Sequence, residues 1–574
     1  MSQRKHRKLR GSGKIVDSEK REVLGTSKVK HQGILSIIWG NRVFLLILLL
    51  GTIAIYFNGM DGAFVSDDYA SIPNNPNIMD LTDTMGDMPS IVIFSNSLIA
   101  NIFGIDSPVP FHIWSLSIYL AICVFAFVFV YLLMGSEIAH LATILFAVLP
   151  IHVEAVTWIS GKPYILSTVF LLIALSCFVL LLRTKNRSYL WLTVFFELLA
   201  IFSDKVRFLS LFLIIVCYVL TYRRSLGVNI KKFLLVVFGL LVLSFVYLTP
   251  SIILRTNVVN SGYNRSDAIF YNPLFQYPTS IAKYLQLIFL PVDLTLYHTM
   301  YIFPLWLNWL ITLTYLTCVI YFYFKNRDIF FSLAFIFLAA APSMAPVKVS
   351  WLVAERYMFL GSLGWCMFMG ILLQKIGENT RVLKWVILGS FMVIYGVRIY
   401  SRNIDWNTNH NLWVNTCQVS PNSHNAWNNI GDDYDKLKDY ENAIKGFTQS
   451  TVVKPDYADA YHNRANIFFK IGRLDLARDS YTTAIGLSPG LYQTYFSLVQ
   501  IDMMEHKLDL ALEHAQRAVQ IQPNNPQSLY VLGVVYAQRG DAVTAMKIFK
   551  QVASQYPKFT LARDALMALE NGAT

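Results

Sequence analysis

Charged side chains are scarce in this chain. Asp, Glu, Lys and Arg make up 15% of its 574 residues, whereas hydrophobic residues make up 55% and the mean hydropathy is +0.45. Soluble globular proteins usually carry about 25% charged residues. This shortage of charge excludes an ordinary soluble protein, and we predict an integral membrane protein.

Cysteine is also scarce, and the six residues show no spacing typical of disulfide pairs or zinc ligands. They are Cys123, Cys177, Cys217, Cys318, Cys366 and Cys417, of which the first five lie inside apolar runs. The sequence also lacks a Gly-rich phosphate loop, a hydrolase triad and a metal-ligand cluster. We therefore predict no protein-bound metal or cofactor, and a divalent metal requirement for catalysis stays open.

Apolar runs near the length that crosses about 30 Å of hydrocarbon recur from residue 34 to residue 400 and then stop. We predict about eleven spans, at residues 34–57, 111–134, 137–158, 161–182, 189–203, 206–222, 233–250, 302–324, 328–346, 354–374 and 383–400. Residues 279–298 are apolar too, but Lys283, Pro291 and Asp293 interrupt them. We expect that segment to be interfacial or re-entrant, because a crossing would reverse every later basic loop.

Basic residues predict the orientation. The N-terminal segment MSQRKHRKLRGSGK is strongly basic, and no small-residue cleavage site follows the first apolar run, so we expect a retained span with a cytoplasmic N-terminus. The connections that then fall in the cytoplasm are basic, at residues 183–187, 223–232, 325–327 and 375–384. An odd number of spans places everything after residue 400 on the non-cytoplasmic face. The net charge of +12 favours membrane lipid over nucleic acid as a partner.

The C-terminal third contains an internal repeat. Prolines recur every 34 residues, at Pro421, Pro455, Pro489, Pro523 and Pro557. This period, with small and large apolar residues at matching positions, is that of the tetratricopeptide repeat. The third unit departs from the pattern, because Asp502 stands where an aromatic residue is expected.

The sequence predicts an all-α fold, with a multi-span helical membrane domain followed by a solenoid of tetratricopeptide repeats. The predicted parts are a basic cytoplasmic tail (1–33), a membrane domain (34–400) with an outer loop (58–110), a connector and half repeat (401–423), four repeats (424–559) and a capping helix (560–574). Stacked repeats form a groove that binds a protein or peptide. Asn429 and Asn463 share one repeat position, where they either hydrogen-bond an extended peptide or satisfy groups within the array.

Ionisable residues gather at the predicted outer ends of the spans. They are Asp67, Asp68, His152, Glu154, Lys162, Lys205, Arg207, Lys348, Glu355 and Arg356. Carboxylates opposite cations at a membrane surface suit transfer of a sugar from a lipid phosphate. The cations hold the phosphate, and a carboxylate takes the proton of the acceptor hydroxyl.

Four segments carry a family resemblance. They are FVSDDYASIPNNPNI (64–78), LPIHVEAVTWISGKPYILS (149–167), VAERYMFLGSLG (353–364) and RNIDWNTNHNLW (402–413), and repeats follow them. In this order they resemble the transmembrane and tetratricopeptide repeat-containing O-mannosyltransferases and their bacterial relatives. The resemblance implies a GT-C class membrane glycosyltransferase that uses a polyprenyl-phosphate sugar as donor. The short repeat array favours a bacterial relative, and hence the bacterial inner membrane over the endoplasmic reticulum.

The resemblance also implies roles for single residues. The family's acidic pair falls on Asp67 and Asp68, taken as catalytic with Asp68 as the favoured general base. Donor-phosphate or substrate contacts fall on His152, Glu154, Lys162, Lys205, Arg207, Glu355 and Arg356. The chain departs from the family at Leu149, where a histidine is usual, and at Lys162, where an arginine is usual. The family's Ser-Lys-Glu is only approximated at residues 203–205.

The same residues have plainer structural explanations. The aspartates suit a turn, and His152 suits the end of a span. Glu355 and Arg356 suit an ion pair, and the lysines and Arg207 suit snorkelling to lipid head groups.

Our prediction is a glycosyltransferase that moves mannose or a similar sugar from a polyprenyl phosphate to a protein hydroxyl. The alternatives are a non-catalytic membrane scaffold for envelope proteins and a glycosyltransferase acting on a lipid or glycan.

Overall fold

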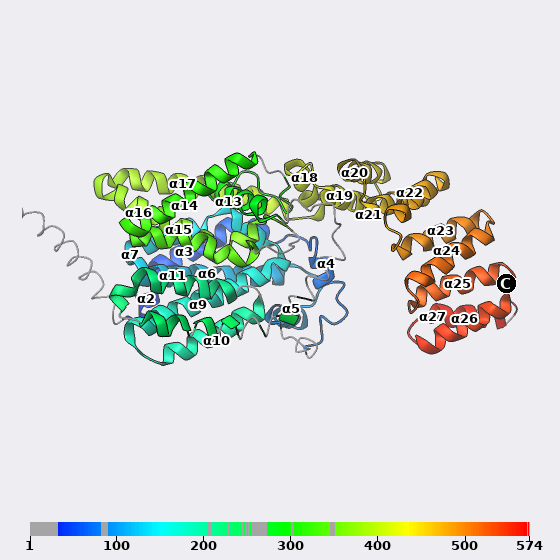
Figure 1. Ribbon diagram of the computed structural model, residues 1–574, viewed down its shortest axis with the longest axis horizontal. Coiled ribbons are helices and arrows are strands. Elements are labelled where there is room, and N and C mark those ends of the chain that lie inside the picture. Colours follow the sequence, from blue (N-terminus) through cyan, green and yellow to red (C-terminus); the bar gives the residue numbers. More distant parts are fainter. Residues whose placement is uncertain are drawn as a thin grey trace, which may run out of the picture. The chain divides into compact units, whose positions relative to one another are not determined.

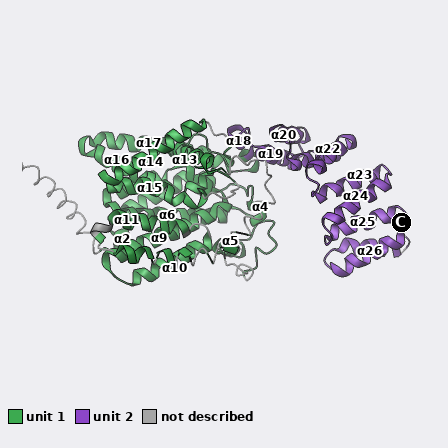
Figure 2. Ribbon diagram, in the orientation of Figure 1, with its two compact units in different colours: residues 1–412 green, residues 413–574 purple. Residues whose placement is uncertain are grey.

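The structure is a computed structural model. It describes residues 32–570 except 82–89, 205–207, most of 227–271, 300–302 and 345–350, and it also describes Gly572. The described residues form helices and contain no strand, which confirms the predicted all-α fold. The chain divides into two compact units, residues 1–412 and residues 413–574 (Figure 2).

The first unit is a bundle of long apolar helices with short helical segments at its ends (Figure 1). The α-helices are α2 Ile34–Gly40, α3 Arg42–Tyr56, α4 Asp68–Ser71, α5 Ile91–Phe103, α6 Val109–Met134, α7 Ser136–Ala147, α8 Val153–Thr157, α9 Lys162–Thr184, α10 Ser188–Ser203, α11 Phe208–Leu226, α13 Pro273–Phe289, α14 Leu305–Lys325, α15 Arg327–Ala340, α16 Ser362–Asn379 and α17 Arg381–Asp405. The short 3-10 helices are η1 Phe57–Gly59, η3 Pro150–His152, η4 Ile159–Gly161, η6 Ala341–Met344 and η7 Glu355–Met358.

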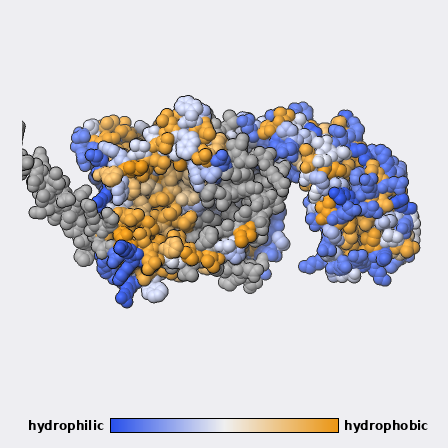
Figure 3. Space-filling view, in the orientation of Figure 1, coloured by the Kyte–Doolittle hydropathy of each residue, from blue (hydrophilic) through white to orange (hydrophobic). Residues whose placement is uncertain are grey.

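Six helical segments in the described residues are long and apolar enough to cross a membrane. They are Arg42–Gly59, Val109–Met134, Ile159–Thr184, Leu305–Lys325, Arg327–Met344 and Arg381–Asp405, and a bent pair, Ser136–Ala147 with Pro150–Thr157, makes up to seven. Large apolar side chains on α3, α14 and α17 are exposed, and much of the visible face of this unit is hydrophobic (Figure 3). Together with the composition, these helices make the chain a multi-pass membrane protein.

The predicted count of about eleven spans is not confirmed. Two predicted spans are shorter apolar helices, Ser188–Ser203 and Leu209–Tyr222. The prediction at 233–250 falls largely outside the described residues. The prediction at 354–374 is divided between η7 and α16. Of the segment predicted as interfacial or re-entrant, residues 279–289 lie in α13, which does not pass as a span.

Pro150 explains why one predicted span is broken. The residue before a proline is disfavoured in the helical conformation, and Leu149 is extended, with ψ 119°. The chain therefore leaves α7 at Ala147 and bends by 58° into η3 and α8. This break turns a sequence that reads as one apolar run into a set of short segments, and these segments hold His152 and Glu154.

The second unit consists of paired helices, as the 34-residue period predicts (Figure 1). They are α19 His424–Lys436, α20 Tyr440–Val453, α21 Ala458–Lys470, α22 Leu474–Leu487, α23 Tyr492–Met504, α24 Leu508–Ile521, α25 Pro526–Gln538 and α26 Ala542–Gln555. Before them α18 Asn409–Val419 crosses the boundary between the units, and after them comes α27 Thr560–Glu570. A Cβ on Gly431 would lie 2.8 Å from the ring of Phe447, so the glycine allows α19 and α20 to pack closely.

Asp502, the departure from the repeat pattern, connects three helices. Its carboxylate is fully buried and accepts hydrogen bonds from Arg478 Nη1 on α22 and from His514 Nδ1 on α24, both at 2.6 Å. Arg478 also donates to Glu505 Oε2 at 2.8 Å. The second and third repeats are therefore held together by a polar bridge where the usual pattern has an aromatic contact.

Replacing Asp502 with asparagine should loosen this bridge, because the amide has one acceptor oxygen in place of two. We expect a loss of about 1–3 kcal/mol of local stability, the usual effect of leaving a buried polar group unsatisfied. Faster amide hydrogen exchange in α22–α24 of the full chain would measure it. The matched control is Asp509→Asn, since Asp509 is 94% exposed in its pair with Arg539 and such pairs contribute little. Equal exchange in both variants would contradict the bridge.

Candidate functional site

The loop that carries the aspartate pair is attached to the segment after α17. Ala63 N donates to Asn407 O at 2.8 Å, and Ser66 N donates to Asn409 Oδ1 at 2.9 Å. The loop begins at the end of η1 and leads into α4, which starts at Asp68. Segments more than 340 residues apart in the sequence therefore fix the position of the acidic pair.

The two aspartates have opposite environments. Asp68 is fully buried, and its carboxylate accepts hydrogen bonds from Val65 N at 3.1 Å, Ser160 N at 2.8 Å and Ser160 Oγ at 2.5 Å. Burial raises the pKa of Asp68 to about 6, although these donors oppose the rise. Asp67 is exposed, and its carboxylate makes no hydrogen bond or ion pair to the described part of the chain. Asp68 thus anchors the loop, while Asp67 faces outward.

Lys162 lies beside this anchor. It is the first residue of α9, it is fully buried, and its Nζ donates to Asn96 Oδ1 on α5 at 2.7 Å. The same ammonium lies 4.9 Å from the ring centre of Phe111. Snorkelling does not describe this lysine, because its charge points into the protein. Lys162 joins α5 and α9 next to Ser160, the partner of Asp68.

Glu154 and Arg356 form a buried ion pair between α8 and η7. Arg356 N donates to Glu154 Oε2 at 2.8 Å, and Arg356 Nη1 donates to Glu154 Oε1. The Arg356 guanidinium also lies 5.4 Å from the ring centre of Trp158 and 5.0 Å from that of Tyr357. The two family motifs that carry these residues are therefore joined by a charged contact with aromatic walls.

Glu355 forms a second buried ion pair, with Arg402 at the end of α17. Its Oε1 accepts from Arg402 Nη2 at 3.2 Å and from Thr295 N at 2.6 Å. The Arg402 guanidinium lies 5.4 Å from the ring centre of Trp406. Glu355 Oε2 is buried without a hydrogen-bond partner among the described residues.

The two ion pairs meet through a pair of indoles. Trp158 stacks on Trp406 with ring centres 5.7 Å apart and an interplanar angle of 29°. Arg356 and Arg402 lie against these two rings, one against each. Arg402 and Trp406 were missed as site residues by the sequence reasoning. Their signal was present in the motif at 402–413, where an arginine and a tryptophan follow closely after an apolar run.

His152 takes no part in the two ion pairs or in the stacking of the two indoles. Its Nδ1 lies 2.9 Å from Tyr119 Oη and its Nε2 lies 2.8 Å from Ser362 Oγ, and the rings of Phe146 and Phe359 pack against it. Both ring nitrogens are used inside the protein, an arrangement that suits a structural histidine. The other predicted basic residues, Lys205, Arg207 and Lys348, lie outside the described residues.

In the second unit, Asn463 Nδ2 donates to Asn428 Oδ1 of the preceding repeat at 3.0 Å. One donor of Asn463 therefore satisfies a group within the array, as the plainer explanation predicts. Asn429 is partly exposed on α19, next to Asn428. Both predicted groove residues thus lie beside an amide contact that links two repeats.

Comparisons with known proteins find similarity in the repeats and over most of the chain. Two family models described as Tetratricopeptide repeat match residues 428–492 and 502–569. Protein O-mannosyl-transferase TMTC3 of Homo sapiens is 24% identical over 481 residues, which cover 71% of this chain and 51% of that protein. The Mus musculus protein of the same name is 25% identical over 394 residues, covering 60% of this chain and 42% of its own length.

Protein O-mannosyl-transferase F38B6.6 of Caenorhabditis elegans is 28% identical over 501 residues, covering 78% of this chain and 67% of that protein. This chain spans about half the length of the human relative and 42% of the mouse relative. The similarity thus extends over most of this chain but over a smaller part of the mammalian proteins.

Proposed function

Because this chain is related to proteins named protein O-mannosyl-transferase, we propose that it is a membrane glycosyltransferase of the GT-C class. It transfers mannose or a similar sugar from a polyprenyl-phosphate donor to a hydroxyl group of a protein. One observation carries the proposal: an exposed carboxylate, Asp67, lies on a loop that its buried neighbour, Asp68, anchors. A general base needs this combination of access and fixed position.

In the proposed reaction Asp67 accepts the proton of the acceptor hydroxyl. The hydroxyl oxygen forms a bond to the anomeric carbon, the bond from that carbon to the phosphate oxygen breaks, and the lipid phosphate leaves with the electron pair. Asp68, held by Ser160 and Val65, positions the loop. This assignment reverses the roles expected from the sequence, because a fully buried carboxylate with three donors has no room for an acceptor hydroxyl.

The donor phosphate requires cationic or hydrogen-bonding groups. Lys162 and Arg356 are buried and engaged with Asn96 and Glu154, so they support the walls of the site instead of presenting free charge. We assign the phosphate contact to Lys205 and Arg207, which follow α10 in the sequence. The support for this assignment is that α10 packs against α5 and α9, the helices that carry Asn96 and Lys162.

The repeats are proposed to bind the acceptor protein. Tetratricopeptide repeats are protein-interaction modules, and the amides of Asn429 and Asn463 suit the backbone of an extended peptide. We propose the non-cytoplasmic face for the aspartates and the repeats, and the basic connections between the predicted spans favour this orientation. The proposed location is the bacterial inner membrane.

The test is transfer by membranes that contain the full chain. Membranes with and without it would receive polyprenyl phosphate carrying radiolabelled mannose, and label would be measured separately in protein, lipid and free glycan. We expect label in protein only when the chain is present. Label in lipid or glycan would support the alternative acceptor, and equal label in both membranes would leave the scaffold as the better description.

A further inference from the structure

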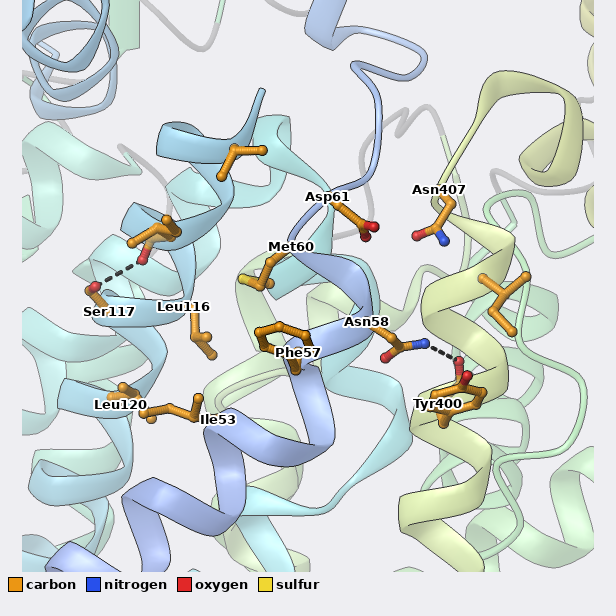
Figure 4. A pocket seen from close by; sticks show the side chains of 13 residues that line it. Ile53, Phe57, Asn58, Met60, Asp61, Leu116, Ser117, Leu120, Tyr400 and Asn407 are labelled. Carbon is orange, nitrogen blue, oxygen red and sulfur yellow. Dashed lines mark hydrogen bonds between the residues drawn. The ribbon is translucent and has the colours of Figure 1, made fainter. Parts of the chain in front are cut away.

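A groove on the surface of the first unit lies between α3, α6 and α17 (Figure 4). It has a volume of about 730 Å³. Its walls are apolar side chains of three helices that are each able to span a membrane. The lining includes Phe57, Ile113 and Ile404, which are 72%, 53% and 42% exposed. Such exposed apolar walls on membrane-spanning helices suit a hydrocarbon chain.

One end of the groove is polar and carries the carboxylate of Asp61 and the side-chain amides of Asn58 and Asn407. Figure 4 shows the carboxylate of Asp61 and the side-chain amide of Asn407 pointing toward each other, with the amide oxygen on the side of Asp61. Asn407 Oδ1 is buried without a hydrogen-bond partner among the described residues. Asp61 is exposed, and its carboxylate forms no ion pair with the residues that the structure describes. The exposed carboxylate of Asp61 is therefore the accessible acceptor at this end of the groove, beside a buried amide oxygen.

The frame around these acceptors is held in place. Asn58 Nδ2 donates to Tyr400 O at 2.9 Å, and Asn58 Oδ1 accepts from Asn403 Nδ2 at 2.9 Å. These bonds join η1 to α17 at the polar end of the groove. Both polar atoms of Asn58 are thereby engaged within the protein, which leaves the exposed carboxylate of Asp61 as the charged group that meets a ligand.

We propose that this groove binds a membrane lipid with a primary ammonium head group. The ammonium donates hydrogen bonds to the carboxylate of Asp61, and a hydrocarbon chain lies along the apolar wall between α3, α6 and α17. An ammonium supplies several N–H donors and a positive charge, and both match an exposed carboxylate.

The charge at the polar end distinguishes this lipid from the proposed donor. A lipid whose head is only a sugar phosphate would bring negative charge to Asp61 and no cation. A trimethylated ammonium carries the charge but has no N–H to donate to the carboxylate of Asp61. The groove therefore selects for a primary amine, independently of the proposed transfer reaction.

The experiment compares two lipids that differ only at the head-group nitrogen. Purified full-length protein in detergent would be titrated with palmitoyl-oleoyl phosphatidylethanolamine or phosphatidylcholine, and bound lipid would be counted by native mass spectrometry. We expect the ethanolamine lipid to bind about tenfold or more tightly, because a hydrogen bond to a charged group is worth about that factor. Equal binding of the two lipids would overturn the proposal.

Two variants locate the preference. Asp61→Asn should abolish it, and Asp106→Asn, which changes another exposed carboxylate before α6, should retain it. Loss of the preference in both variants, or retention in both, would place the ammonium elsewhere. Free ethanolamine should not displace the lipid, because the hydrocarbon chain of the lipid contributes to binding through its contacts with the groove. Displacement by millimolar ethanolamine would identify a small-amine site and refute the lipid.

Discussion

Replacing Asp67 with asparagine is expected to lower glycan transfer by about 10²-fold to 10⁴-fold, the range for loss of one positioned proton-transfer group. Asparagine has nearly the size of aspartate, but it does not accept the acceptor's proton. The fold should remain intact, because Asp67 is exposed and its side chain does not cap α4. Transfer would be measured in membranes that contain equal amounts of each variant, with the thermal unfolding temperature measured on purified protein.

Asp68→Asn separates this assignment from the one suggested by the sequence. An amide at this position would direct an NH₂ group toward one of the backbone donors of Val65 or Ser160, so both transfer and stability should fall. Asp106→Asn, at an exposed carboxylate in the same outer loop, should transfer sugar like the wild type. If Asp67→Asn retains full transfer and Asp68→Asn is stable but inactive, Asp68 is the base and our assignment is wrong.

Breaking the Glu154–Arg356 pair should have the largest effect on stability. Both side chains are buried, and removing one partner of such a pair typically costs about 3–5 kcal/mol, because the other charge stays buried without compensation. We therefore expect Arg356→Met and Glu154→Leu each to lower the free energy of unfolding by about this amount. Unfolding of the full chain in detergent would be followed by near-ultraviolet circular dichroism.

The double variant tests whether the pair itself is responsible. Glu154→Leu with Arg356→Met removes both charges, so it should be less destabilised than the sum of the single variants. The control pair is Glu137 with Lys384, in which Glu137 is 51% exposed, and Glu137→Gln should cost about 1 kcal/mol or less. Additive effects in the double variant would show that each side chain acts independently.

The repeat array was predictable because its signal is local. Each unit has its own proline, small residues and aromatic residues within 34 positions, and the observed helix pairs follow that period. The membrane class was equally accessible, since apolar runs and the scarcity of charge depend on composition. Asp502 shows the limit even here. The sequence showed that Asp502 departs from the repeat pattern, but the role of its side chain depends on Arg478 and His514 in neighbouring helices.

The spans were less predictable, because hydropathy does not register how the chain bends. Pro150 lies inside one continuous apolar run, and only the backbone shows the 58° break that follows α7. The sequence also identified the charged residues of the site, but it did not show which of them form ion pairs with each other. Glu154 and Arg356 are 202 residues apart, and Arg402 is connected to them by its ion pair with Glu355 and by the stacking of Trp158 on Trp406.

The sequence by itself therefore determined the class of the protein, its two-part organisation, the repeats and most of the polar residues near one end of the helices. These features follow from composition and short periods, which need no knowledge of distant contacts. Tertiary structure decided which aspartate is exposed, which cations are already paired and where a lipid-sized groove lies. Burial and hydrogen bonding set those properties, and both depend on segments that meet only when the chain folds.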